Sequence, residues 1–205
     1  MIGIKKEIKM GSRDSILANI KHNKPELLPL PEIDFGVFED TLDLVEEFTK
    51  KVEIVGGNVF NLGSIEEVLK QVKTLFPDTS HNYSTVEGTA NFNTISLETL
   101  QRPHDLNDLD VLVLESSVAV SENGAVWISN NQLPVRVLPF ITKHLVLVLN
   151  KSCLVPNLHH AYKALNGIDN DFGVFISGPS KTADIEQSLV IGAHGALSLS
   201  VFLID

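Results

Sequence analysis

The fold class is decided by residues 110–128, which read DVLVLESSVAVSENGAVWI. The run Val111–Leu114 is continuously apolar, as is typical of a strand buried on both faces of a parallel sheet. Two further β-prone runs flank the turn at 121–124, and its Asn123-Gly124 pair is a strong hairpin signal. The stretch therefore predicts a buried strand followed by an antiparallel hairpin.

Helices and strands alternate on both sides of this stretch. Upstream, the pattern predicts helices over 42–52 and 64–75 with a strand over 58–62 between them, whereas the polar segment 79–108 predicts a functional loop or short elements. Downstream, it predicts strands over 145–149, 173–177 and 197–204, and helices over 156–165 and 180–191. The alternation indicates an α/β fold with a mostly parallel sheet.

An N-terminal arm precedes this pattern. Ile16, Leu17 and Ile20 form a helical stripe over 12–22, with Ser12 as the expected cap. Three prolines then interrupt any periodic pattern, which predicts an extended linker. The chain thus divides into a helix and Pro-containing linker over residues 1–37 and an α/β domain over residues 38–205.

Composition excludes several classes of protein. The 16 Lys and Arg residues against 26 Asp and Glu give a net charge of -10, which argues against binding to nucleic acid or to an anionic membrane surface. No apolar run approaches the roughly 20 residues of a membrane span, and charges stand where a signal peptide needs an apolar stretch. We expect a cytoplasmic protein.

Few residues are suited to hold a metal or cluster. A single cysteine, Cys153, can form neither an internal disulfide nor a thiolate cluster. His22, His81 and His104 show no metal-ligand spacing. We therefore expect no metal and no cofactor in this chain, and any iron-sulfur cluster would belong to partner proteins.

The stretch SGPSKTADIE at 177–186 is the first candidate site. A predicted strand runs there into a small-residue turn and a predicted helix start, where free amides and a lysine would attract an anion. The alternative is a well-capped turn without a ligand. The candidate ligand-binding residues are Gly178, Ser180, Lys181, Thr182 and Asp184, and Glu186 would lie against the helix dipole.

The stretch IGAHGA at 191–196 is the second candidate. His194 stands between Gly192 and Gly195, so a ligand can approach closely and the imidazole can move protons near neutral pH. A glycine that ends a helix, beside a structural histidine, is the alternative explanation.

A third candidate is the hairpin turn, where Glu122 could act as nucleophile or general base. Glu115 is a second acidic candidate in the same neighbourhood, and Arg136, Lys143 and His144 are candidates for an anion-binding rim. A solvated turn with ordinary surface charges is the alternative.

These segments carry a family resemblance. GPSKTADIE at 178–186 and LVIGAHG at 189–195 resemble the C-terminal signature of the LUD-domain, or LutC/YkgG-type, lactate utilisation proteins. The segments 118–124 and 136–144 are also similar to blocks of that family. The sequence departs from the pattern at Asn123, where the family has threonine, and at Ala196, where it has proline.

The resemblance implies a three-layer α/β fold of the NagB/RpiA/CoA-transferase-like kind. It also implies a role in L-lactate oxidation to pyruvate alongside iron-sulfur partner proteins. On this interpretation Glu122 and His194 are catalytic candidates, and the protein binds a small anionic ligand through Gly178, Ser180, Lys181, Thr182, Asp184, Gly195 and Arg136. A homo-oligomer is left open.

Two alternatives remain. The turn at 121–124 is similar to the motif of CoA transferases, which would make Glu122 the nucleophile of a stand-alone enzyme that forms an acyl-enzyme thioester; the Gly-x-Gly-Gly loop of those enzymes is absent. The protein could instead be a non-catalytic assembly subunit. These interpretations leave open whether the protein is an enzyme.

Overall fold

The computed structural model describes residues 11–29, 31–32, 34–38, 43–167, 171–185 and 188–205. Internal contacts divide the chain into two units, residues 1–34 and residues 35–205. In the first unit, α1 spans Ser12–His22 as predicted, although its N-cap is Gly11 and no side chain caps it. All functional candidates lie in the second unit.

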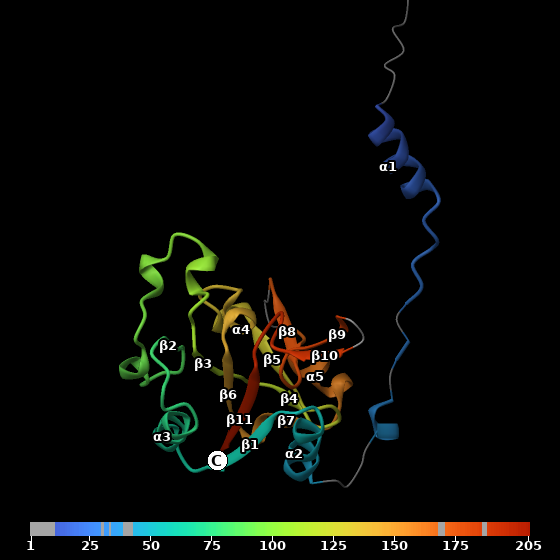
Figure 1. Ribbon diagram of the computed structural model, residues 1–205. Coiled ribbons are helices and arrows are strands. Elements are labelled where there is room, and N and C mark those ends of the chain that lie inside the picture. Colours follow the sequence, from blue (N-terminus) through green and yellow to red (C-terminus); the bar gives the residue numbers. More distant parts are fainter. Residues whose placement is uncertain (1–10, 30, 33, 39–42, 168–170, 186–187) are drawn as a thin grey trace, which may run out of the picture. The chain divides into compact units, whose positions relative to one another are not determined.

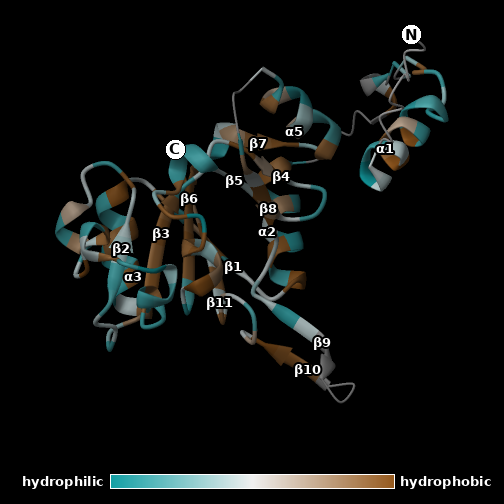
Figure 2. Ribbon diagram, turned by 90° about the horizontal axis from the view of Figure 1, so that it is seen from above, coloured by the Kyte–Doolittle hydropathy of each residue, from teal (hydrophilic) through white to brown (hydrophobic). Residues whose placement is uncertain are grey.

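A five-stranded parallel sheet forms the centre of the second unit (Figure 1). Its strand order is β1 (Asn58–Leu62), β11 (Ser198–Ile204), β6 (His144–Asn150), β3 (Val111–Glu115) and β2 (Asn82–Ser84). Of the three inner strands, β3 contains the run Val111–Leu114 that the sequence predicted to be buried, and β6 and β11 correspond to the predicted strands over 145–149 and 197–204. Figure 2 shows all three as mostly hydrophobic. The predicted parallel sheet is confirmed.

Both faces of this sheet are covered, which explains the unbroken apolar runs. Val111 and Val113 of β3 pack with Val68 and Val72 of α3 (Ile65–Leu75) on one face. Leu112 and Leu114 point to the other face, into the cluster that contains Phe48 and Val52 of α2 (Leu44–Ile54). The result is a three-layer α/β fold.

A second, four-stranded sheet contains the predicted hairpin. Its order is β7 (Leu154–Val155), β4 (Ala119–Val120), β5 (Ala125–Ser129) and β8 (Gly173–Ile176), with β4 and β5 antiparallel. Gly124 closes the turn at φ +65°, and a Cβ there would lie 2.8 Å from the amide nitrogen of Val52, so only glycine fits. The helix α5 (Leu158–Leu165) packs on this sheet through Ala161.

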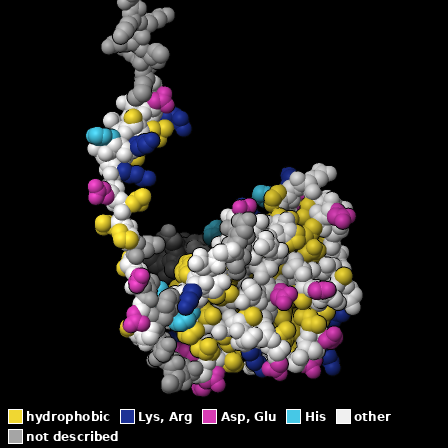
Figure 3. Space-filling view, turned by 180° about the vertical axis from the view of Figure 1, so that it is seen from behind, with side chains coloured by type: hydrophobic (Ala, Val, Ile, Leu, Met, Phe, Trp, Pro, Cys, Tyr) yellow, Lys and Arg dark blue, Asp and Glu magenta, His cyan; other side chains and the backbone are white. Residues whose placement is uncertain are grey.

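Short elements fill the remaining segments. The polar segment 79–108 contains β2 and three 3₁₀ helices, Ala90–Phe92, Leu97–Thr99 and Pro103–Leu106. Further 3₁₀ helices span Phe35–Phe38, Asn130–Gln132 and Lys151–Cys153, and α4 spans Leu138–Ile141. In the view of Figure 3, acidic and basic side chains are scattered over the α/β unit among apolar ones rather than gathered into patches.

The predicted helix over 180–191 is wrong. The segment forms an antiparallel hairpin of β9 (Lys181–Ile185) and β10 (Ser188–Ile191). The Gly192 amide donates to the Ser180 carbonyl at 3.0 Å, whereas twelve residues of helix would separate these groups by about 18 Å. The hydrogen bond between Ser180 and Gly192 therefore requires a hairpin, although the residues at the start of the segment resemble a helix cap.

Asp110 joins the amino-terminal ends of β2, β3 and β6. Its carboxylate accepts from the Lys143 ammonium at 2.7 Å and from the amides of Ser80 and His81 at 2.9 and 3.0 Å. Burial opposes the charge, but the ammonium and the two amides outweigh it and hold the pKa of Asp110 well below its ordinary value. The ionised carboxylate therefore stabilises the fold.

We predict that Asp110→Asn lowers the free energy of unfolding at pH 7 by about 2 kcal/mol, or the Tm by roughly 4–8 °C. Because the folded pKa is depressed, the stabilisation is complete above the unfolded value of about 3.9 and is lost as the pH falls below it. Thermal unfolding measured from pH 7 to pH 2.5 should show that the difference in Tm between the variant and the parent becomes smaller below pH 4. Asp78→Asn, at an exposed carboxylate, is the control; a difference independent of pH would contradict the assignment.

Candidate functional site

The two signature segments meet at the base of the β9–β10 hairpin. The Ser180 amide donates to the Ala196 carbonyl at 2.9 Å, and the Ser180 carbonyl accepts from the Gly192 amide. Gly195 lies next to the Ser180 side chain. Candidate residues from 178–182 and from 192–196 are therefore brought together as one structural unit, here called the hairpin base.

The hairpin base packs on the carboxyl end of α2. Gly178 has φ +72°, and a Cβ there would come within 2.6 Å of the Val55 carbonyl oxygen. That oxygen also accepts a hydrogen bond from the Lys181 ammonium, a favourable place for a cation at the end of a helix. Ser177 Oγ donates to the Asn123 carbonyl at 2.8 Å, so the turn that carries Glu122 lies beside the same base.

The expected anion site at a helix N-terminus is absent here, because residues 181–185 form a strand. The Ser180 amide and the Lys181 ammonium, both expected to face an anion, already donate to protein carbonyls. Thr182 pairs with Val190 across the hairpin. The Asp184 side chain and Glu186 lie outside the described residues, so their predicted roles stay predictions.

His194 lies in a bend with an exposed side chain. It follows β10 rather than a helix, so the alternative in which a glycine ends a helix at this point is wrong. Its predicted part in proton transfer remains a prediction.

Glu122 lines a pocket of about 560 Å³ between α2 and α5. One carboxylate oxygen accepts from the amide of Leu158, the first residue of α5, at 3.2 Å, and so satisfies a donor that the helix leaves unpaired. Leu44, Pro156 and Leu158 contribute apolar walls, and Lys51, which is paired with Glu47 at 3.1 Å, also lines the pocket. The full lining is Val37, Leu44, Glu47, Lys51, Ser121, Glu122, Pro156, Asn157, Leu158, His159 and Tyr162.

Glu115 lines a different pocket, so the two acidic candidates do not share a site. This second pocket, here called the polar crevice, has a volume of about 700 Å³ and lies at the carboxyl ends of β2 and β3. Its lining residues are Tyr83, Ser84, Thr85, Glu115, Asn130, Asn131, Gln132, Leu133 and Pro134. Sequence reasoning missed the Asn130-Asn131-Gln132 run; its position directly after a hairpin strand was the available signal.

Arg136 is connected to the polar crevice through Asn130. Its Nε donates to Asn130 Oδ1 at 2.9 Å, and the guanidinium lies 5.2 Å from the centre of the Phe172 ring. Nε is thus engaged in a hydrogen bond, although Arg136 as a residue is exposed to solvent.

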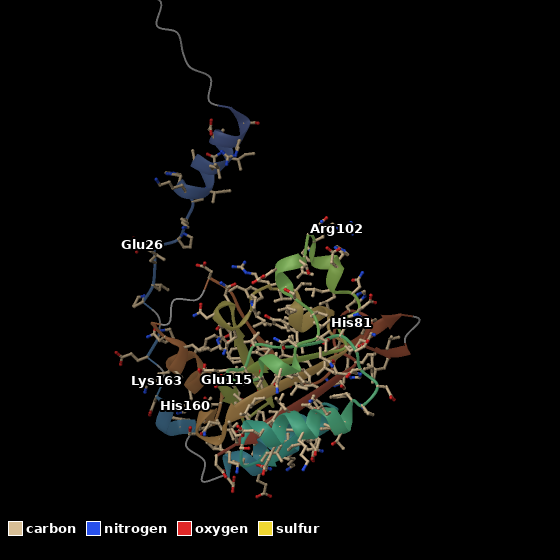
Figure 4. The ribbon with its side chains drawn as sticks, turned by 90° about the vertical axis from the view of Figure 1, so that its left-hand side faces the viewer. Glu26, His81, Arg102, Glu115, His160 and Lys163 are labelled. Atoms are coloured by element: carbon tan, nitrogen blue, oxygen red, sulfur yellow. The ribbon has the colours of Figure 1, made fainter. Side chains whose placement is uncertain are left out.

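Lys143 and His144 lie at the other end of the sheet, where Lys143 pairs with Asp110. His144 stacks on Phe76 with ring centres 4.3 Å apart and hydrogen-bonds Ser198 Oγ at 2.8 Å; burial lowers its pKa. Figure 4 shows His81, beside Asp110, and Glu115 toward opposite ends of the unit. The expected rim of Arg136, Lys143 and His144 is therefore not formed.

Within the described ranges, no group of three or more His, Cys, Asp or Glu side chains is placed to hold a metal ion. Among the helices that the structure describes, none combines the length and apolar character that a membrane span requires.

Comparisons with known proteins agree with the fold. The crystal structure of a DUF162 family protein from Deinococcus radiodurans superposes with a TM-score of 0.61 at 15% identity, covering 79% of this chain and 96% of that one. At this identity the likeness shows the three-layer fold alone.

Curated relatives match part of the chain. "Lactate utilization protein C" of Oceanobacillus iheyensis is 31% identical over 102 residues, covering 47% of this chain and 44% of the relative. The protein of the same name from Bacillus pumilus is 35% identical over 99 residues, covering 45% and 41%. The chain spans less than half the length of these relatives.

A family model described as the LUD domain matches residues 45–204. The match includes the hairpin turn, the polar crevice and both signature segments. Because it extends over most of the chain, this protein belongs to the LUD domain family.

Proposed function

We propose that this protein is a LutC-type component of lactate utilisation, which supports the oxidation of L-lactate to pyruvate together with iron-sulfur partner proteins. The observation that carries the proposal is the LUD-domain match, together with relatives named Lactate utilization protein C. With Cys153 as its single cysteine, the chain lacks the thiolates that a cluster needs, so the redox centres are assigned to the partners.

Arg136 is the proposed anchor for the small anionic ligand. A guanidinium offers five N–H donors, and hydrogen bonding to Asn130 uses Nε while the two terminal NH₂ groups remain for a carboxylate. Arg136 has no acidic partner among the described residues, in contrast to Arg102, which pairs with Asp105 at 3.4 Å. The Phe172 ring beneath the guanidinium limits its motion.

The role in lactate utilisation is tested by complementation. In a Bacillus pumilus strain that lacks its Lactate utilization protein C, expression of this chain should restore growth on L-lactate. Growth on glucose is the control for general fitness, and an immunoblot confirms that the protein accumulates. Failure to grow on lactate despite normal accumulation would argue against a LutC-type role.

The anion site is tested by titrating purified protein with L-lactate and with pyruvate in a calorimeter. Arg136→Gln should weaken binding by roughly 10- to 100-fold, because two charge-assisted hydrogen bonds are lost. Arg102→Gln removes a guanidinium of the same kind elsewhere and should leave the affinity unchanged. Equal affinity of the Arg136 variant and the parent for these anions would show that Arg136 is not the anchor of the anion site.

A second candidate, acyl transfer at Glu122, is favoured by the pocket with apolar walls between α2 and α5. Glu122→Gln keeps an oxygen that can accept from the Leu158 amide but removes the nucleophile, whereas Glu122→Ala removes both. We expect a Tm loss of roughly 2–4 °C for the alanine variant and a smaller one for the glutamine variant, since a lost cap costs about 1 kcal/mol. Full complementation by Glu122→Gln would exclude the nucleophile role and leave the capping role.

A further inference from the structure

The polar crevice lies where parallel α/β sheets usually bind ligands, outside the carboxyl ends of neighbouring strands. Ser84 and Glu115 are the last residues of β2 and β3, and the Thr85 amide continues the pairing by donating to the Val113 carbonyl at 3.1 Å. The polar crevice has a volume of about 700 Å³, which is in the range of small-molecule sites.

Two carboxamides of the crevice are fixed as hydrogen-bond donors. Gln132 Oε1 accepts from the amide and the hydroxyl of Ser129 at 2.7 and 2.8 Å. Asn130 Oδ1 accepts from Arg136 Nε. Because both carbonyl oxygens are engaged, each side chain offers its NH₂ group, and these bonds hold the donors in place.

The acceptors come from the strand ends. The Glu115 carboxylate has no hydrogen-bond or ion-pair partner in the part of the chain that the structure describes, and neither do the hydroxyls of Tyr83 and Thr85. A carboxylate only accepts hydrogen bonds, whereas the hydroxyls both donate and accept. The crevice therefore combines fixed donors, an anionic acceptor and groups that serve as either.

This combination selects against charged ligands. An anion would be repelled by Glu115, and an ammonium group, which only donates, would leave the NH₂ groups of Asn130 and Gln132 unpaired. A hydroxyl group donates to the carboxylate and accepts from an amide at the same time. Two neighbouring hydroxyls match the two oxygens of a planar carboxylate.

We propose that the polar crevice binds an uncharged molecule that presents a vicinal diol, such as a pentose or the ribose of a nucleoside. Glu115 accepts from the diol, and Asn130 and Gln132 donate to it. The site is separate from the anion anchor of the proposed function, because Arg136 does not line the crevice.

Saturation-transfer NMR with adenosine, D-ribose and 2′-deoxyadenosine tests the proposal. Binding of adenosine alone would identify a nucleoside, and binding of D-ribose as well would identify the sugar as sufficient. 2′-Deoxyadenosine, which lacks the diol, should bind about tenfold more weakly than adenosine. Glu115→Gln should weaken the binding of adenosine by a similar factor. Glu98→Gln, at an exposed glutamate outside the crevice, should leave adenosine binding unchanged.

Tyr83→Phe removes one hydroxyl from the crevice and provides a second variant should Glu115→Gln fold poorly, as judged by its Tm. The proposal is overturned if no ribose-containing compound binds at millimolar concentration, if the deoxynucleoside binds as well as adenosine, or if both variants bind like the parent. Lactate titration of the same samples reports on the anion anchor independently, so failure of one site is distinguishable from failure of the other.

Discussion

Burial of β3, β6 and β11 on both faces determines where the surrounding helices and the second sheet must lie. Strands that are apolar on both sides require two covering layers, since any face left open would expose valine and leucine to water. The amphipathic α3 supplies one layer, and α2 with the second sheet supplies the other. Polar side chains at the carboxyl ends of β2 and β3 line the polar crevice.

The end of α2 organises the other candidate residues. Gly178 lies against the Val55 carbonyl, which also accepts a hydrogen bond from the Lys181 ammonium. Gly124 lies against the amide of Val52. One helix terminus thus fixes the relative positions of the hairpin turn and the hairpin base, although they are more than fifty residues apart in sequence. Glu122 is held at the start of α5 by the same turn.

Periodicity predicted the strands and most helices well, because burial leaves a direct pattern in the sequence. It failed at 180–191, where the cap-like residues favoured a helix locally but a contact between Ser180 and Gly192 required a hairpin. The site was harder to predict, since pockets join residues from distant segments. Glu115 and Asn130 line one pocket while Glu122 lines another, and nothing in their spacing indicates this.

The glycines of the turn and of the hairpin base affect how a mutational scan of the signature should be interpreted. Any side chain at Gly124 or Gly178 collides with the backbone of α2, so substitutions there displace a helix whose other residues form the core. Loss of activity at these positions reports on the architecture rather than on ligand chemistry. Side chains such as Glu115 and Arg136, which can be exchanged without such a collision, are the positions at which function can be measured apart from folding.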